Sequence, residues 1–286
     1  ASCSKVIDVK ETDFIGGDVA LKTVDNVESG IIGAYSAMNV EMGILLNSVF
    51  ADEVRVAEFY NAATVHEWQY ASTDISLRDS YTAFPLYYRI IDRVNRVLEA
   101  LPNVKATTAA QEATKNRVKG EALFLRAFAH FEMYRFYSNT ADGAALAVAY
   151  VETPSLSPVA RMTVTPFFAK LNADLAAAKS LVPATNTDIY RASKHAVTAL
   201  QARAALYTKD YANASTFATE YIAAFPLASK TNFPLIWKDG NNSELAFKLS
   251  RTTTAGGRIG ALYRGTSANS ANIGTITWKP TQRLLD

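Results

Sequence analysis

The chain has 286 residues, 49% of them hydrophobic, which is enough to bury the core of one large domain or two modest ones and excludes a disordered chain. Its 29 Lys and Arg residues against 27 Asp and Glu residues leave a formal net charge of +2, which excludes the strong positive field of a nucleic-acid-binding protein. No run of 18 or more apolar residues occurs, so the sequence predicts no membrane-spanning helix.

The N-terminal segment, residues 1–24, mixes two adjacent glycines with scattered charges, and we expect it to form an extended tether. Near its start the single cysteine, Cys3, follows the small residues Ala1 and Ser2. Small residues directly before a cysteine near a chain start are typical of the end of a bacterial lipoprotein signal, in which that cysteine is acylated. We therefore expect a lipid anchor on Cys3, and the alternative is an unmodified thiol.

Two helices are predicted in the first third of the chain. The first begins at Asp25, with Asp25 or Asn26 as its N-cap, because apolar residues recur from there at spacings of three and four. The second covers Phe84–Leu101 and is ended by Pro102. We expect the residues between them, Asn39–Tyr81, to form a long inserted loop of the kind that often binds ligands.

A long helix is predicted over Ala109–Tyr137, and its polar residues fall on two opposite sides with apolar residues between them. A helix with this pattern packs against neighbours on two sides, which is typical of an inner helix in a layered helical array. The polar residues are Lys119, Arg126 and His130 on one side, and Glu121, Glu132 and Arg135 on the other.

Three further helices are predicted after a second long loop, Ser138–Val164. The first covers Thr165–Leu181, since Pro166 falls in its first turn, where the missing N–H group costs nothing. The other two cover Ser193–Thr208 and Tyr211–Phe225. We expect this second loop, like the first, to be a place where binding occurs.

The segment Ser193–Pro226 has the spacing of a tetratricopeptide unit. Ala202 in its first helix and Ala214 in its second are 12 residues apart, and the closing proline follows after another 12. Small side chains are required at these two positions because the paired helices cross closely. Lys209 departs from the pattern, which usually has glycine in the turn. The expected fold is mainly α, a tetratricopeptide-like solenoid of helical pairs with long inserted loops and an irregular, Gly-rich C-terminal section.

The last part of the chain, residues 250–286, is rich in glycine, serine, threonine and asparagine and is predicted to be irregular. Short strands are expected at Glu244–Leu249 and Ile273–Trp278. The expected organisation is therefore a tether over residues 1–24, a helical repeat domain over residues 25–249 and the start of an irregular section over the remainder.

Residues Arg117–Phe131 resemble the signature helix of the SusD/RagB lipoproteins of Bacteroidetes, whose core reads G-E-A-x-F-L-R-A followed by aromatic residues. Four further pieces occur in the order in which that family has them, and together they cover most of the chain from Asp25 to Leu249. The pieces are Asn95, Asp174–Leu175 with Ala178 before Pro183, Arg191–Asp210, and Ser243–Phe247 after Trp237.

The resemblance implies a protein that is lipid-anchored to the outer membrane of a Gram-negative bacterium and binds nutrient glycans at the cell surface. It also implies a partner, a TonB-dependent porin of the SusC type that the protein covers like a lid, and neither catalysis nor a cofactor. Members of the family carry a second, irregular half, whose start Pro280–Asp286 resembles before the sequence stops. We therefore expect either a fragment or a truncated member.

Glycan binding needs aromatic rings that stack on sugar rings, with carboxylate, amide or guanidinium groups nearby to bind hydroxyls. Both the first inserted loop and the Gly-rich section contain such residues, and the alternative for each aromatic one is inward packing on the solenoid. The candidates in the loop are Tyr60, Trp68 and Tyr70 with the polar partners Asp52 and Arg78, and those in the Gly-rich section are Tyr263 and Trp278.

We expect no enzymatic activity. Arg126 and Glu121 are interpreted as structural, because a guanidinium inside a helical array commonly pairs with a carboxylate or carbonyl of the next helix. The acidic residues of the first loop give no indication of two carboxylates at the separation that glycoside cleavage requires, and the histidines are too widely spaced to predict a metal site. These residues are Glu41, Asp52, Glu53 and Glu58, and His66, His130 and His195.

The competing hypothesis is a helical-repeat adaptor that binds a peptide or protein on its concave face. An adaptor would concentrate exposed aromatic residues on the concave helix faces, whereas a glycan-binding protein would place them in loops. The aromatic residues of the first inserted loop favour glycan binding.

Overall fold

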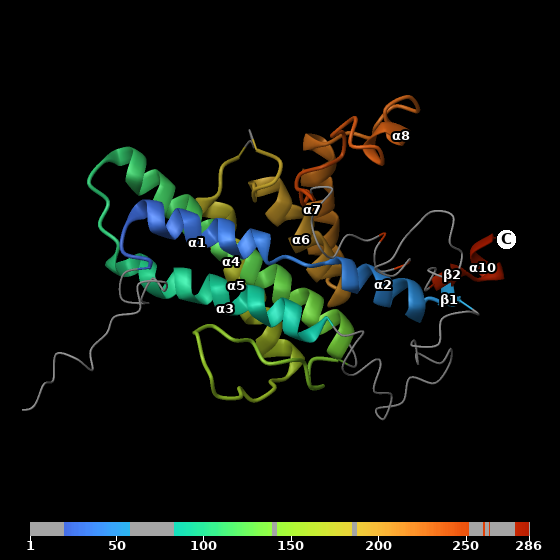
Figure 1. Cartoon of the computed structure of the whole chain (residues 1–286), viewed down its shortest axis with the longest axis horizontal. Coiled ribbons are helices and arrows are strands. Elements are labelled where there is room, and N and C mark those ends of the chain that lie inside the picture. Colours follow the sequence, from blue (N-terminus) through green and yellow to red (C-terminus); the bar gives the residue numbers. More distant parts are fainter. Residues whose placement is uncertain are drawn as a thin grey trace, which may run out of the picture.

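The computed structural model describes residues 20–57, 83–138, 142–184, 188–251 and 278–285, together with Gly260 and Tyr263. These residues form an array of helices with a small two-stranded sheet at one end (Figure 1). The longer helices are α1 (Val24–Ser36), α2 (Glu41–Phe50), α3 (Phe84–Ala100), α4 (Ala109–Tyr137), α5 (Val164–Leu181), α6 (Lys194–Tyr207) and α7 (Tyr211–Ala224); the short elements are η3 (Leu101–Asn103), α8 (Phe233–Ile236), α10 (Gln282–Leu285), β1 (Val54–Val56) and β2 (Trp278–Pro280).

Helix α4 is the centre of the array. It packs against α1, α3, α5 and α6, and Figure 1 shows α1, α3 and α5 running alongside it. Both polar sides of this helix contain buried residues, since Glu121 and His130 are each 0% exposed. The prediction that this helix packs on two sides is confirmed, and so is the mainly α, tetratricopeptide-like fold.

Gly120 of α4 allows the end of α5 to approach closely. A Cβ atom at this position would lie 2.8 Å from the Cβ atom of Leu181 and 3.1 Å from the backbone nitrogen of Val182. Contacts this short force the backbone apart in a well-packed interior. The glycine of the signature helix is therefore required by the packing of α4 against α5.

Helices α6 and α7 form the predicted helical pair. Ser193 caps α6, with its hydroxyl accepting a hydrogen bond from the N–H of Ala196 at 3.3 Å, and Asp210 caps α7 by accepting from the N–H of Asn213 at 3.2 Å. Between them Lys209 has φ of 60°, the left-handed conformation that glycine adopts most readily. The lysine that departs from the repeat pattern thus adopts the backbone conformation that the pattern requires.

The start of α1 differs from the prediction. Thr23 is the N-cap, because its hydroxyl accepts a hydrogen bond from the N–H of Asn26 at 3.2 Å, and the helix begins at Val24. Asp25 lies instead in the first turn, where its negative charge interacts favourably with the helix dipole. The predicted cap was therefore two or three residues late.

The first inserted segment, Asn39–Tyr81, was predicted as a loop, and this is wrong for its first half. Residues 41–50 form α2, whose Leu45 and Val49 are buried, and residues 54–56 form β1. Strand β1 pairs antiparallel with β2, so that this insertion is joined to the Gly-rich C-terminal section. Residues 58–82 lie outside the part of the chain that the structure describes.

The predicted strand at Glu244–Leu249 is also wrong. Glu244 has φ of 67°, which interrupts an extended chain. Phe247 packs edge-on against Phe124 of α4, with ring centroids 5.8 Å apart. The described part of this segment therefore packs on α4 and is not paired in the sheet, which consists of β1 and β2. Of the other predicted strand, Ile273–Trp278, the structure describes only Trp278, which begins β2.

The stretch Val24–Phe50 is long and apolar enough to cross a membrane when judged by length and composition alone. In the structure it is divided between α1 and α2, and Val27 and Ile31 of α1 are fully buried. Helix α1 packs against α3 and α4. Burial of this kind is typical of a core helix.

Candidate functional site

The guanidinium of Arg126 in α4 is the centre of a buried polar network. Its Nε and Nη2 atoms donate to the two carboxylate oxygens of Asp174 in α5, at 2.6 and 2.7 Å. Its Nη1 atom donates to Asn95 Oδ1 in α3 at 3.2 Å and to the carbonyl oxygen of Glu152 at 3.1 Å. The hydroxyl of Tyr150 donates to Asp174 at 2.7 Å. The network joins three helices to the segment that follows α4, and its two-pronged ion pair is well oriented for a buried site.

His130, one turn along α4, binds the same segment. Burial lowers the pKa of His130 to about 3, so its ring is neutral at physiological pH. The Nε2 atom accepts a hydrogen bond from the N–H of Val151 at 2.9 Å, which places the proton on Nδ1, where it is donated to the carbonyl oxygen of Arg126 at 2.9 Å. The ring stacks on Tyr150 with centroids 3.9 Å apart. Both ring nitrogens of this buried histidine are thus hydrogen-bonded.

These buried side chains hold the backbone of Ala149–Glu152, which we call the clamped segment. Besides Arg126 and His130, the amide of Asn95 donates to the carbonyl oxygen of Val151 at 2.9 Å, and the hydroxyl of Tyr88 donates to that of Ala149 at 3.4 Å. Successive backbone groups are therefore bound by side chains of α3 and α4. The position of the clamped segment therefore depends on both Asn95 and Arg126.

Glu121 forms a second buried network on the other side of α4. It accepts hydrogen bonds from Arg191 at 2.7 and 3.0 Å and from Arg117 at 3.0 Å. Both arginines also bind Glu28 of α1, at 2.5 and 2.7 Å. The interpretation of Glu121 as structural agrees with this arrangement, which links α1, α4 and the residues before α6.

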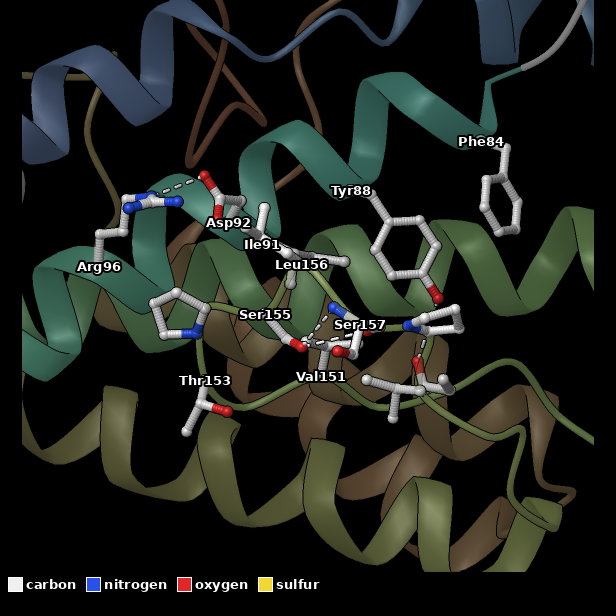
Figure 2. A pocket seen from close by; sticks show the side chains of 14 residues that line it. Phe84, Tyr88, Ile91, Asp92, Arg96, Val151, Thr153, Ser155, Leu156 and Ser157 are labelled. Atoms are coloured by element: carbon white, nitrogen blue, oxygen red, sulfur yellow. Dashed lines mark hydrogen bonds and ion pairs between the residues drawn. The ribbon is translucent and has the colours of Figure 1, made fainter.

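A cavity of about 560 Å³ lies between α3 and the chain from Ala149 to Val159, and we call it the α3 cavity (Figure 2). The clamped segment forms part of its wall, so the buried network of Arg126 sets the position of that wall. The opposite wall consists of α3 side chains, namely Phe84, Tyr88, Ile91, Asp92 and Arg96.

The α3 cavity combines aromatic rings with polar groups. Phe84 is 43% exposed, and its ring centroid lies 4.8 Å from that of Tyr88. Figure 2 shows Tyr88 between Phe84 and an exposed ion pair, in which Arg96 Nε donates to Asp92 at 2.9 Å. The hydroxyl of Ser155 lies on the facing loop. Such a wall can stack on the apolar face of a ring-shaped ligand while its polar groups bind hydroxyls.

Three of the residues predicted from the sequence to bind ligand lie together near the end of α2. The hydroxyls of Tyr263 and Ser48 are 3.1 Å apart, and the carboxylate of Asp52 is 3.7 Å from the guanidinium of Arg283. Trp278 is only 4% exposed and packs with Leu45 and Val49, so its ring lies in the interior rather than on a binding surface. The other predicted residues, Cys3, Tyr60, Trp68, Tyr70 and Arg78, lie outside the described residues.

The sequence interpretation missed the residues of the α3 cavity. Tyr88 and Phe84 lie on a regular amphipathic helix, where an aromatic residue is expected to face the core. The signal that was available is the length of the second loop, Ser138–Val164, because residues 149–159 of that loop close the cavity.

Comparison with known proteins adds to this geometry. Residues 8–206 match the model of the SusD-like family that is described as starch-binding associating with outer membrane. SusD-like protein P38 of Formosa agariphila is 22% identical over 242 residues, which cover 83% of this chain and 45% of that protein.

Two solved structures share the fold. A SusD superfamily protein from Bacteroides thetaiotaomicron is 21% identical, with 92% of this chain and 61% of that chain covered and a TM-score of 0.73. Surface glycan-binding protein A from Bacteroides thetaiotaomicron, solved in complex with laminarihexaose, is 17% identical, with 77% and 47% covered and a TM-score of 0.56.

The chain spans about half the length of the relatives that it matches, since it covers between 45% and 61% of those three proteins. The family model nevertheless matches well over half of this chain and includes the signature helix at its centre. The chain therefore belongs to the SusD-like family.

Proposed function

We propose that this protein captures glycans at the surface of a Gram-negative bacterium and passes them, chemically unchanged, to a TonB-dependent porin in the outer membrane. The observation that carries the proposal is the α3 cavity, in which aromatic and hydrogen-bonding side chains lie against a wall held by the family's signature residues. The description of the family and the laminarihexaose complex of a protein with the same fold support glycans as the ligand class.

Capture follows from the geometry of the α3 cavity. The rings of Phe84 and Tyr88 offer apolar faces to a sugar ring, and Asp92 and Arg96 at the other end of the cavity offer an acceptor and donors to its hydroxyls. The wall facing them is held by Arg126 and its partners, so binding requires little ordering of the backbone.

The same cavity favours binding without cleavage. Hydrolysis of a glycosidic bond by the usual mechanism needs two carboxyl groups, one of them acting as a general acid. Among the described residues that line the α3 cavity, Asp92 supplies the one carboxylate, and it is paired with Arg96. We therefore assign the cavity to binding and not to catalysis.

Location and transfer complete the proposal. Acylation of Cys3 would attach the protein to the outer membrane. The predicted tether over residues 1–24 would then be shorter than expected, because Thr23 caps α1 and the buried Val24 begins it. A glycan held in an open surface cavity can leave toward a neighbouring channel when its affinity is moderate, because weaker binding shortens the residence time. Co-purification of the lipid-anchored protein with a TonB-dependent porin from solubilised outer membranes is the measurement for the partner.

Binding is tested first on a glycan array and then by isothermal titration calorimetry with laminarihexaose. We expect Tyr88→Ala to lower the affinity for the bound glycan about tenfold, since a stacked ring contributes about 1 kcal/mol. Tyr88→Phe, which keeps the ring, should retain most of the affinity. The matched control is Tyr211→Ala, an exposed position on α7. Unchanged affinity in folded Tyr88→Ala would refute the assignment of this site.

The adaptor hypothesis has one observation in its favour. Exposed apolar side chains follow one another along α7 and beyond it, including Ile222, Leu227 and Trp237, and Trp237 is 77% exposed. Exposed apolar residues in such number are typical of protein-contact surfaces. If Trp237→Ala abolished a protein interaction of the chain and the glycan array gave no ligand, the adaptor hypothesis would replace glycan capture.

A further inference from the structure

A second cavity, of about 350 Å³, lies between α2, α4, α6 and the chain at Phe247–Leu249. We call it the arginine cavity. Its charged lining consists of Arg135, Arg203 and Lys248 against a single carboxylate, Glu132. Cations therefore outnumber anions among the described residues of this lining.

The carboxylate of Glu132 lies between the two guanidinium groups. It is 6% exposed, and it accepts from Arg135 Nη1 at 2.6 Å and from Arg203 Nη2 at 3.5 Å. Arg135 has further acceptors, with the hydroxyl of Tyr207 at 2.9 Å and the amide oxygen of Asn47 at 3.4 Å. Because Glu132 is already bound by Arg135, it neutralises Arg203 only weakly.

Arg203 is the least satisfied cation of the set. Its side chain is 47% exposed, its one hydrogen-bond acceptor among the described residues is Glu132, at the 3.5 Å limit, and its guanidinium lies 5.3 Å from the ring centroid of Phe131. The remaining N–H groups of its planar guanidinium are available for a ligand with two oxygen atoms, such as a carboxylate.

Lys248, the third cation of the lining, already has acceptors nearby. Its ammonium group binds Asp239 at 3.2 Å and Asn242 at 3.0 Å, so it is committed to neighbours of its own segment. Arg203 thus remains the donor through which the cavity can bind an anion. A charge-assisted pair with a carboxylate is stronger than a neutral hydrogen bond.

Aromatic surface lies in the same cavity. Phe128 of α4 and Phe247 of the returning chain are both partly buried and both line it. Their rings can pack on the apolar face of a sugar, as in other carbohydrate sites built from aromatic walls and a few polar groups. The lining therefore combines aromatic rings, which can pack on a sugar ring, with a guanidinium group, which can bind a carboxylate.

We propose that the arginine cavity binds an acidic sugar, a uronic-acid residue of a glycan, whose carboxylate pairs with Arg203 while Phe128 and Phe247 pack on its ring. This inference rests on the proposed function, glycan capture, and narrows it to glycans that carry carboxylates. It assigns acid selectivity to the arginine cavity and leaves the α3 cavity as the site of contact with neutral sugar rings.

The test compares titrations of the 286-residue chain with hexagalacturonate and with neutral laminarihexaose, each at low and high salt. We expect hexagalacturonate to bind at least about tenfold more tightly at low salt and to lose most of that advantage in about 1 M salt. Arg203→Gln should weaken hexagalacturonate about tenfold to a hundredfold and leave laminarihexaose unchanged. Arg203→Lys, which keeps the charge, should recover part of the affinity.

The matched control is Arg89→Gln, the same change of charge at an exposed α3 residue that lines neither cavity, and it should leave both affinities unchanged. Equal affinity for the two glycans, or an equal loss of both in Arg203→Gln, would overturn the inference while glycan capture stands. A sulfated oligosaccharide bound as tightly as hexagalacturonate would overturn the carboxylate assignment. If neither glycan bound and the array gave no ligand, the proposed function itself would fall.

Discussion

The two sides of α4 carry two arginine–carboxylate sets that differ in how completely their hydrogen bonds are satisfied. Arg126 donates from all three of its nitrogen atoms, at 3.2 Å or less, to the buried side chains of Asp174 and Asn95 and to the carbonyl oxygen of Glu152. Arg203 has a single acceptor among the described residues, at 3.5 Å, and half of its side chain is exposed. A satisfied buried arginine holds a framework, whereas a partly satisfied one beside a cavity is available to a ligand.

The largest expected effect sharpens this contrast. Arg126→Met removes the partner of Asp174 and leaves a buried carboxylate unpaired, so we expect the free energy of unfolding to fall by about 3–5 kcal/mol. Arg203→Gln should change it by less than about 1 kcal/mol, since its pair is partly exposed. Chemical denaturation of both variants is the measurement.

The double variant Arg126→Met with Asp174→Leu is the control for that prediction. It removes both charges, so much of the lost stability should return. Equal stability losses in Arg126→Met and Arg203→Gln would break the distinction between framework and ligand-binding arginines.

The pH dependence of stability tests the burial of His130, which lies beside Arg126. His130 has a folded pKa of about 3, below the ordinary value of about 6.5. The unfolded chain therefore binds more protons between these two values, and stability is complete above about pH 6.5 and falls as the pH drops. Between pH 7 and pH 5 the loss should be about 2 kcal/mol.

His130→Gln is the comparison for this experiment. Its free energy of unfolding should be lower than that of the parent chain at pH 7 but should vary less between pH 7 and pH 5. The same slope in both proteins would mean that His130 titrates normally in the folded state, contrary to its burial between Arg126 and Tyr150.

A further effect of comparable size concerns the packing of α4 against α5 at Gly120. Gly120→Ala places a Cβ atom against Leu181 and Val182, and we expect it to cost about 1–3 kcal/mol of stability. The matched control is Gly33→Ala in α1, where a Cβ atom meets nothing within 4 Å and the helix former alanine should be neutral or stabilising. Thermal unfolding of the two variants gives the answer, and a neutral Gly120→Ala would show that α5 can move away from α4.

The helices were largely predictable because their signals are local. Apolar spacing and the flanking capping residues placed α4 at its observed ends, Ala109 and Tyr137, and α6 and α7 within one residue of the prediction. Helix α2 was missed because it is short and lies in a segment whose length suggested a loop. The predicted strand at Glu244–Leu249 failed because Glu244 adopts a left-handed backbone conformation and Phe247 packs on α4, neither of which the local sequence indicates.

The candidate site was predictable only in its general location. The second long loop was identified as a place for binding, and it closes the α3 cavity. The aromatic residues of that cavity, Phe84 and Tyr88, could not be recognised as ligand-binding residues. Aromatic residues of an amphipathic helix usually face the core. Trp278 was predicted to bind the ligand because it lies in a Gly-rich segment. The local sequence gives no indication that its ring packs against α2.

By itself the sequence determined that this chain is a helical solenoid with the SusD-like signature, because helix periodicity, capping and repeat spacing act over a few residues. Only the tertiary structure decided which charged residues belong to the framework and which are open to a ligand. The reason is distance along the chain: Arg126 binds partners 31 and 48 positions away, and the acceptor of Arg203 lies 71 positions away. Whether a charge is satisfied depends on what folding brings beside it.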